Sequence, residues 1–346
     1  MITAYPFGTL PDGTPVTRYR LQNSENAYVD ILDYGATIQA LVMPDKYGMP
    51  TDVVLGYDTL SGYARGTLYF GATVGRHCGR IGGGSFTLSG KTYTLDKNSG
   101  PNHIHGGVSG FHQRMFAAEI LPNNCLCLHL TSPDGDQGYP GNLEVSVRFT
   151  LFPNNTLVIR YGGVSDRDTL LNLTNHSYFD LSGGQDPMGQ RLYLDAETYA
   201  ENDENTLPTG RLLPVAGTAF DFNKGKLLRR DLEAEDAQLR LCRGYDHSFL
   251  LRRTGALREF ARLSSPLTGI VMQVATDLPA VQVYTANFVE EKQGKGGRHY
   301  KPHSAVCLET QFLPNAIHIP GAEAPVLRTG AEYDHSTAFV FSTEEG

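Results

Sequence analysis

The residue best suited to proton chemistry in this sequence is His176, which lies in a segment rich in hydrogen-bonding side chains. In residues 171–183, leucine and phenylalanine are interspersed with asparagine, threonine, serine and tyrosine. This pattern favours a packed, strand-like element that presents polar groups on a rigid backbone. A histidine held in that way readily accepts and donates protons near neutral pH. We therefore take His176 as a candidate acid or base.

A second candidate is Glu309, a carboxylate that follows the short apolar run 306–308. A carboxylate at the end of an apolar strand is rarely buried without a partner or a purpose. Glu309 and His176 offer an acid and base pair, and the sequence has no G-x-S-x-G elbow, reactive-cysteine signature or EF-hand loop. Two reactions on a polyhydroxylated substrate suit this set: opening and closing of a sugar ring, or glycosidic hydrolysis by Glu309 and Asp246.

Three further polar blocks carry side chains that can bind a sugar. A glycine-rich block contains Arg80, whose guanidinium offers donors to ligand oxygens, and a surface ion pair is the competing interpretation. His103 and His105 lie two residues apart, so on a strand both imidazoles share one face. Donation to substrate hydroxyls suits them better than metal binding, and a structural role in a tight turn is the alternative for His103. Asp246 can accept hydrogen bonds from vicinal hydroxyls, or belong to a surface turn.

The composition indicates a globular protein whose partner is small and uncharged. Of the 346 residues, 40% are hydrophobic and 19% are charged, which suits a large buried core. A net charge of -8 argues against a nucleic-acid or anionic-membrane surface, because phosphate recognition needs clustered Lys and Arg. No apolar run reaches the length of a membrane span, and residues 1–16 do not resemble a signal peptide. The five scattered cysteines indicate a reducing cytoplasm, and the pair Cys125 and Cys127 lacks the further ligands of a zinc site.

The elements that would position these residues are antiparallel strands. Residues 142–152 alternate strictly between apolar and polar types, which predicts a half-buried strand, and residues 156–161 follow as its hairpin partner. Residues 85–95 predict another hairpin. Helix formers are concentrated in residues 229–241, which predict a surface turn or one brief helix. The sequence therefore predicts an all-β fold, a large antiparallel β-sandwich with very few short helices, as a single domain over residues 1–346.

The polar blocks occur in the order found in aldose 1-epimerases, also called galactose mutarotases. The motifs that carry the resemblance are GATVGRHCGRI, PNHIHGG, LTNHSYFDLSG, GYDHSF and LETQFLPNA. The amino-terminal third resembles the same family through FGTLPDGTPV, DYGATIQALVMPDKYG and DVVLGYD. The similarity covers almost the full chain, and five ordered motifs are far more specific than any one of them.

The resemblance implies an enzyme without a cofactor or metal, on the galactose mutarotase-like supersandwich, which interconverts the α and β anomers of a free monosaccharide. It would act as a monomer or homodimer. By this analogy Glu309 takes the proton of the C1 hydroxyl while His176 gives one to the ring oxygen, and closure reverses the roles. Because the base must be ionised and the acid protonated at one pH, we expect their environments to separate the two pKa values. The residues expected to bind sugar hydroxyls are Arg80, His105, Asp246 and Gln282.

Two positions depart from the family pattern. Gly79 stands before Arg80 where the family usually carries Asn, so one amide contact to the sugar is missing. His77 either compensates for this loss or is a spectator. Asp180 stands where Asn is commoner, and the sequence offers no interpretation of it. The departure at Gly79 affects the preferred sugar more than the reaction.

Three alternatives remain open on the sequence alone. A glycoside hydrolase would hold the carboxylates of Asp246 and Glu309 about 5–5.5 Å or about 6.5–9.5 Å apart across the scissile bond. A non-catalytic sugar-binding module would be protected from melting by its ligand without changing the rate of anomer exchange. A related hexose 6-phosphate epimerase would need extra basic residues near the far end of the sugar, which the acidic balance does not favour.

Overall fold

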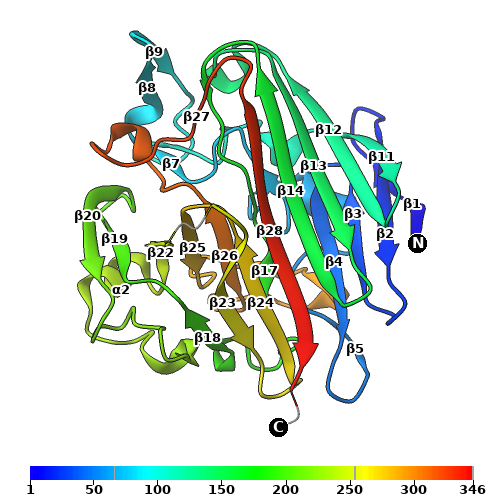
Figure 1. Cartoon of the computed structure of the whole chain (residues 1–346). Helices are drawn as coiled ribbons and strands as arrows, with labels where there is room; N and C mark the ends of the chain where they lie inside the picture. The colour runs from blue at the N-terminus through cyan, green and yellow to red at the C-terminus, as the bar shows by residue number, and fades with distance from the viewer. Residues whose placement is uncertain (66, 253–254, 345–346) are drawn as a thin grey trace.

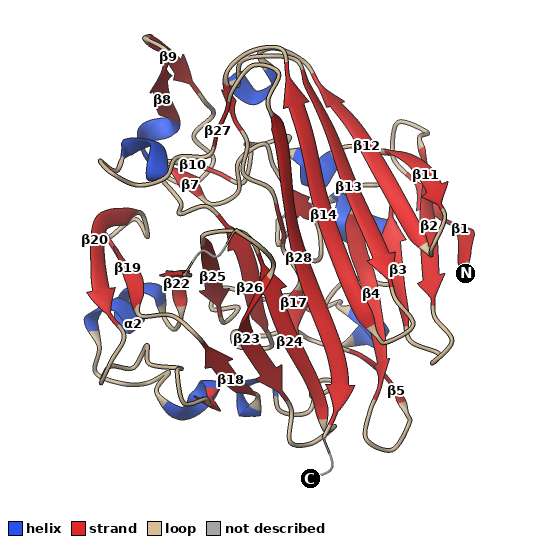
Figure 2. Cartoon of the chain, in the orientation of Figure 1, coloured by secondary structure: helices blue, strands red, loops and turns tan. Residues whose placement is uncertain are grey.

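Strands dominate the computed structural model, which describes residues 1–65, 67–252 and 255–344 (Figure 1, Figure 2). Within these ranges the α-helices are two short ones, α1 (Leu60–Ala64) and α2 (Ala237–Cys242). Asp236 caps the N-terminus of α2, because its carboxylate accepts hydrogen bonds from the backbone N–H groups of Gln238 and Leu239. The predicted all-β class is confirmed, and of the surface turn or brief helix predicted for residues 229–241 the structure shows the brief helix α2.

The largest sheet has nine strands, and its long central strands run side by side through Figure 1. The C-terminal strand β28 lies between β14 and β24, so the end of the chain joins segments that are far apart in sequence. In spatial order the strands are β11 (Ala117–Leu121), β12 (Cys125–Ser132), β13 (Leu143–Leu151), β14 (Thr156–Ser165), β28 (Glu332–Thr343), β24 (Ile270–Thr276), β23 (Arg258–Ser264), β18 (Arg191–Leu194) and β21 (Lys226–Leu227).

Local sequence patterns explain two hairpins of the fold. Every apolar position of β13 is buried and every intervening position is exposed or half-buried, as strict alternation predicts. Strand β14 pairs with it in antiparallel register. The hairpin of β8 (Ser85–Leu88) and β9 (Lys91–Thr94) turns at Ser89 and Gly90, with φ angles of 51° and 77°. Positive φ at both turn residues matches the twist of the flanking strands. Both predicted hairpins are confirmed.

Two smaller sheets pack against the nine-stranded sheet. Val29 and Leu41 from the five-stranded sheet, Val281 and Leu308 from the six-stranded sheet, and Phe149 from β13 belong to one hydrophobic core cluster. The strands, in spatial order, are β1 (Ile2–Thr9), β2 (Pro15–Gln22), β3 (Tyr28–Leu32), β4 (Thr37–Pro44) and β5 (Pro50–Asp52) in the five-stranded sheet, and β17 (Tyr178–Phe179), β26 (Val306–Gln311), β25 (Ala280–Tyr284), β22 (Asp246–Leu250), β19 (Thr198–Asn202) and β20 (Pro208–Pro214) in the six-stranded sheet.

Strand β26 is buried along its whole length, on both faces. Val306 and Leu308 point into the core, and the Thr310 hydroxyl meets that of Thr337 on β28 at 2.5 Å. Because side chains alternate along a strand, Cys307 and Glu309 point to the opposite face of the six-stranded sheet. That second face carries the polar groups of the candidate site.

His176 lies where the chain leaves one pairing and enters another. It follows β16 (Thr174–Asn175), which pairs with β6 (Thr73–Val74), and precedes β17, which pairs with β26. The backbone N–H of His176 donates to the carbonyl of Ala72 at 2.9 Å, and its backbone carbonyl accepts from the N–H of Gly71 at 2.9 Å. The strand-like element expected for residues 171–183 is thus interrupted at its centre, because its two halves pair with different strands.

Candidate active site

A cavity of about 210 Å³ opens on the second face of the six-stranded sheet. It is many times larger than the ~10–15 Å³ that one water molecule needs. The residues predicted from the sequence come from six separate segments of the chain, and all six of them line this cavity: Arg80, His105, His176, Asp246, Gln282 and Glu309.

The register of three antiparallel strands brings the polar residues together. Gln282 on β25 lies directly between Ser248 on β22 and Glu309 on β26. In the next row of the same face, Tyr284 lies between Asp246 and Cys307. Directly opposed side chains on neighbouring strands are in contact range. Residues more than 60 positions apart in sequence therefore form one polar surface.

Glu309 and His176 form the central pair of this surface. Glu309 Oε1 lies 3.7 Å from His176 Nε2, and the two residues are 3% and 4% exposed. Burial raises the pKa of Glu309 well above its usual value, and the nearby Asp246 raises it further. Burial also lowers the pKa of His176 to about 3. The environments therefore shift the two pKa values in opposite directions, and in each case burial favours the uncharged form of the group.

Aromatic rings hold the imidazole of His176 in one plane. The ring of Tyr178 stacks on it at 4.9 Å between centroids with an interplanar angle of 15°. Tyr69 stacks at 5.8 Å and 13°. Stacked rings restrict rotation of the imidazole and leave its two nitrogens to face different partners, Glu309 at Nε2 and Cys307 at Nδ1.

Asp246 is oriented by a chain of hydrogen bonds across the strands. Gln282 Nε2 donates to Asp246 Oδ1 at 2.7 Å, and Ser248 Oγ donates to Gln282 Oε1. The serine thus fixes which end of the Gln282 amide faces Asp246. Burial raises the pKa of Asp246, and the charge of Arg80 opposes this shift. The charge of Arg80 also lowers the pKa of Glu309, so one guanidinium partly offsets the effect of burial on two carboxyl groups.

His103 and His105 do not share one face, contrary to the expectation from their spacing. Strand β10 ends at Ile104, and His105 has a φ of 52°, which turns its side chain into the cavity. Gly79 N–H donates to His105 Nδ1 at 3.3 Å, so the proton of the neutral ring resides on Nε2. His103 is buried, with Nδ1 2.8 Å from the carbonyl of Asp96 and Nε2 2.8 Å from the Tyr139 hydroxyl. His103 therefore has a structural role, although it lies on β10 and not in a tight turn.

Comparison with known proteins assigns this architecture to a family. The sequence profile of the aldose 1-epimerase family matches residues 17–340. The chain belongs to the aldose 1-epimerase family. Galactose mutarotase of Homo sapiens is 41% identical over 345 residues, covering 99% of this chain and 98% of that protein. Aldose 1-epimerase of Escherichia coli K12 is 34% identical and covers 96% of this chain and 97% of that protein.

Solved structures agree with this assignment. A galactose 1-epimerase from Lactobacillus acidophilus superposes with a TM-score of 0.87 at 28% identity, covering 100% of this chain and 99% of that one. An aldose epimerase homologue from C. elegans gives the same TM-score at 31% identity, covering 94% and 98%. This aldose 1-epimerase is therefore an isomerase on the galactose mutarotase-like fold, as the sequence predicts.

The two departures from the family pattern have different structural contexts. Gly79 has a φ of 69°, and a Cβ there would lie 2.8 Å from Pro314 Cγ, so the backbone passes close to the cavity wall. His77 is fully buried and lies outside the cavity lining, so it does not replace the missing amide. Neither of its ring nitrogens has a hydrogen-bond partner among the residues that the structure describes.

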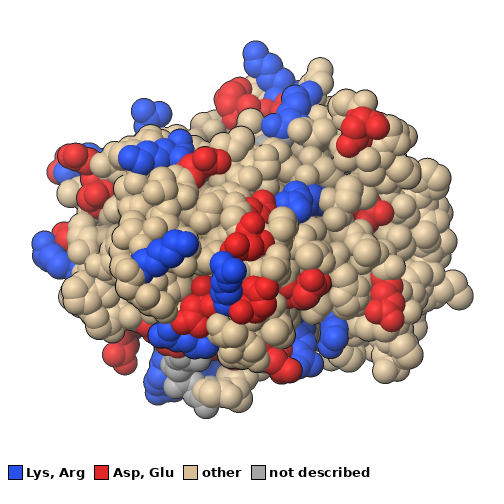
Figure 3. Space-filling model, turned by 90° about the horizontal axis from the view of Figure 1, so that it is seen from above, with Lys and Arg blue, Asp and Glu red and all other residues tan. Residues whose placement is uncertain are grey.

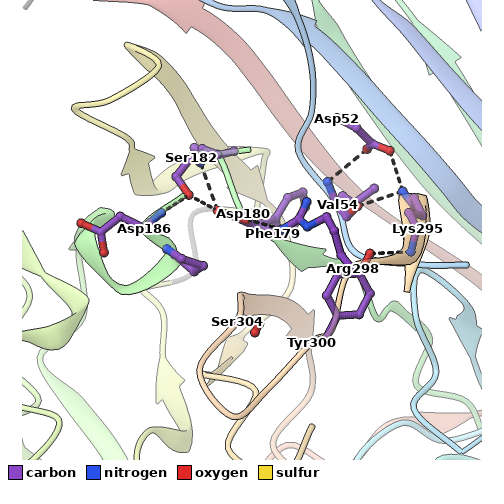
Figure 4. A network of polar contacts seen from close by, with 12 residues as sticks. Asp52, Val54, Phe179, Asp180, Ser182, Asp186, Lys295, Arg298, Tyr300 and Ser304 are labelled. Atoms are coloured by element: carbon purple, nitrogen blue, oxygen red, sulfur yellow. Dashed lines mark hydrogen bonds and ion pairs between the residues drawn. The ribbon is translucent and has the colours of Figure 1, made fainter. Parts of the chain in front are cut away.

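Asp180 also lies outside the cavity lining and takes part in a structural network (Figure 4). Its carboxylate accepts from Arg298 at 3.3 Å and from the Ser182 hydroxyl at 2.5 Å. In the same view Lys295 Nζ binds Asp52 at 2.7 Å. Arg298 and Lys295 belong to the connection between β25 and β26. Their ion pairs with Asp180 and Asp52 attach this connection to the rest of the fold. The same connection carries a rim residue of the cavity, Phe288.

The donor atoms of His176, Cys307 and Glu309 all lie within 4.8 Å of one another, and this is the one such trio of potential metal ligands in the described part of the chain. An imidazole offers one nitrogen to a given ion. Here Nδ1 makes the contact with Cys307 and Nε2 the contact with Glu309, so the two side chains meet different nitrogens of the ring. The arrangement suits hydrogen bonding better than the convergence of three ligands on one ion.

Several cavity residues were not predicted from the sequence. They include Gln311 and Tyr284, which lie two residues from Glu309 and Gln282 on the same strand faces. The strand period would have found both, because residues two apart share a face. Tyr69 and Asn202 belong to segments that gave no sequence signal, and Phe288 lies six residues after Gln282. None of the described helices is long and apolar enough to cross a membrane.

Proposed function

We propose that this enzyme interconverts the α and β anomers of free hexoses such as galactose and glucose, by acid and base catalysis at Glu309 and His176. The observation that carries the proposal is the 3.7 Å pair of Glu309 Oε1 and His176 Nε2 in the wall of one cavity. Relatives named galactose mutarotase and aldose 1-epimerase, matched over nearly their full length, support this substrate class.

The reaction moves one proton at each end of the C1–O5 unit. Ionised Glu309 takes the proton of the C1 hydroxyl, and the freed electron pair forms the C1 carbonyl. The C1–O5 bond breaks, and its electrons pass to the ring oxygen, which takes a proton from the His176 imidazolium. Rotation about the C1–C2 bond then presents the other face of the aldehyde. Closure runs the same transfers backwards and gives the opposite anomer.

The buried pair carries one proton throughout this cycle. Before ring opening it exists as carboxylate and imidazolium, and after ring opening as carboxylic acid and neutral imidazole. Because burial raises the pKa of Glu309 and lowers that of His176, it favours the second form. The second form is the one that accompanies the open-chain aldehyde. Burial of the pair therefore offsets part of the cost of transferring the two protons.

Substrate binding falls to the remaining polar groups of the cavity. Arg80 and the Nε2–H of His105 donate to sugar oxygens, while Asp246 accepts from a hydroxyl and is held in place by Gln282. Arg80, Asp246 and Glu309 are the charged residues among the described lining. One cation opposite two carboxylates suits a neutral sugar rather than a phosphorylated one. Acidic and basic side chains are also intermingled over the face shown in Figure 3.

The compartment proposed is the cytoplasm. All five cysteines of the chain are free, and four of them are buried. Free thiols are typical of a reducing environment.

The test replaces each member of the pair by a neutral amide side chain that cannot exchange protons at these pH values. We expect Glu309→Gln and His176→Asn each to lower kcat by about 10² to 10⁴, the usual contribution of one positioned acid or base. Anomerisation of freshly dissolved α-glucose and α-galactose is followed by polarimetry, with the uncatalysed rate subtracted.

A second pair in the chain supplies the matched control. His129 Nε2 lies 3.3 Å from Glu119 Oε2 on the exposed face of the nine-stranded sheet. Glu119→Gln and His129→Asn should leave the rate unchanged. Near-normal anomerisation by folded Glu309→Gln or His176→Asn would refute the assignment, and release of a reducing end from a disaccharide would indicate a hydrolase instead.

A further inference from the structure

The two ring nitrogens of His176 have different neighbours. Nε2 faces Glu309 across 3.7 Å, and Nδ1 lies 3.7 Å from Cys307 Sγ, within hydrogen-bonding range for sulfur. His176 and Glu309 line the cavity, whereas Cys307 is fully buried and outside the lining. Cys307 therefore contacts the imidazole from outside the cavity lining.

The sheet register that places Glu309 also places this thiol. Cys307 and Glu309 are two residues apart on β26, so their side chains share a face. Cys307 is paired with Tyr178, whose ring stacks on His176 at 4.9 Å. Base, thiol and stacking ring are thus fixed by the pairing of two strands, and the imidazole lies among them.

The thiol of Cys307 remains protonated. Burial and the nearby carboxylates of Glu309 and Asp246 raise its pKa well above the usual value. A neutral thiol can donate through S–H and accept through its sulfur lone pairs. A carboxylate in this place would only accept, and a backbone carbonyl likewise.

We propose that Cys307 is a positioning residue for the isomerisation: its neutral thiol is a two-way hydrogen-bond partner that holds His176 Nδ1 and so keeps Nε2 directed at the ring oxygen. This inference rests on the role of His176 in the proposed function. In the imidazolium, Nδ1–H donates to Sγ while the Nε2 proton passes to the ring oxygen. The neutral ring left behind keeps its proton at Nδ1 and presents a bare Nε2, ready to recover the proton on closure.

The thiol also serves the resting enzyme. When the neutral ring carries its proton on Nε2, Nδ1 is bare and accepts the S–H of Cys307. His176 Nδ1 therefore keeps a hydrogen-bond partner whether or not it carries a proton. An anionic partner would stabilise the imidazolium and retain its proton, whereas a weak neutral partner allows transfer in both directions, as an epimerase requires.

The experiment compares Cys307→Ala, which removes the partner, with Cys307→Ser, which keeps a group that both donates and accepts. We expect Cys307→Ala to lower kcat by about 10-fold to 100-fold, the scale of a misplaced catalytic group. KM should stay near the wild-type value, because the side chain does not line the cavity. Cys307→Ser should restore most of kcat.

A matched control exists at a second thiol and imidazole. Cys242 Sγ lies 3.8 Å from His247 Nε2, both are buried, and neither lines the cavity. Cys242→Ala should therefore keep the wild-type kcat.

A spectroscopic measurement separates positioning from loss of packing. In ¹⁵N-histidine-labelled protein, the His176 resonances are assigned by their absence in His176→Asn. We expect the Nδ1 and Nε2 shifts of Cys307→Ser to resemble wild type and those of Cys307→Ala to move towards a mixture of tautomers. This readout remains informative if the alanine variant is less stable.

The outcomes distinguish the two proposals. Wild-type kcat and shifts in Cys307→Ala, or a serine variant as slow as the alanine variant, would overturn the role of Cys307. If His176→Asn is inactive in the same assay, only this inference fails. If His176→Asn is active, the proposed acid itself is wrong.

Discussion

Strands β13 and β26 belong to two sheets that pack together, yet their side chains are buried in different patterns. β13 alternates between buried apolar residues and exposed or half-buried polar ones, so one face packs and the other meets solvent. β26 is buried on both faces, with Val306 and Leu308 in the main core and Cys307 and Glu309 on the opposite face, where Glu309 lines the cavity. The nine-stranded sheet has a single buried face in this region, whereas the six-stranded sheet buries a second face that is polar.

The second buried face has an energetic consequence. Burying a polar group without full compensation is unfavourable, and burying a charge is more so. The row of Ser248, Gln282 and Glu309 compensates in part through hydrogen bonds and in part through the uncharged form of the carboxyl group. We infer that the apolar contacts of the nine-stranded sheet stabilise the fold while the polar face of the six-stranded sheet provides the chemistry.

Truncating the core side of this comparison should have the largest effect on stability. Phe149 on β13 is 0% exposed and belongs to the main core cluster. Phe149→Ala should lower the free energy of unfolding by about 3–5 kcal/mol, through lost burial and an unfilled cavity. Denaturant titration measures the loss, and kcat of the folded fraction should be unchanged. A large loss of kcat with normal stability would show that stability and catalysis are not divided between the two sheets in this way.

The same contrast explains what the sequence predicts and what it does not. Alternation in residues 142–152 predicts β13 because a strand with one solvent face repeats every two residues. The six site residues were identified by their motifs. The way in which Asp246, Gln282 and Glu309 lie side by side depends on the pairing of β22, β25 and β26, which no local pattern encodes. For that reason the contacts of Ser248 with Gln282 and of Cys307 with His176 were not predicted, and the turn at His105, with φ of 52°, was missed.

The polar face should show the opposite stability effect from Phe149. The pKa of Glu309 is raised in the folded state, so between the unfolded pKa and the folded one the unfolded chain releases a proton that the native protein keeps. Stability is therefore lost as the pH rises through this window. Glu309→Gln removes the loss and should raise the free energy of unfolding at pH 8 by about 0.5–2 kcal/mol.

Thermal melting at two pH values checks whether Glu309 lowers the stability of the fold. The gain in Tm for Glu309→Gln over wild type should be clear at pH 8 and should shrink near pH 4, where the carboxyl is protonated in both states. A variant less stable than wild type at pH 8 would mean that the charged carboxylate is well compensated in the native site.

The pH dependence of kcat should show the smallest change, because the buried pair keeps one proton over a wide range. A second proton enters only as the pH approaches the His176 pKa of about 3, lowered by burial, and the one proton leaves only above the raised pKa of Glu309. Between these limits the ratio of the two one-proton forms does not depend on pH. We therefore expect kcat to vary by less than about twofold between pH 5 and 7, where an ordinary histidine would change its charge. Polarimetric rates corrected for the uncatalysed reaction measure the profile, and circular dichroism at each pH verifies the fold. An acid limb with a midpoint near the usual histidine value would mean that His176 titrates as a solvent-exposed group and that the pair does not share a single proton.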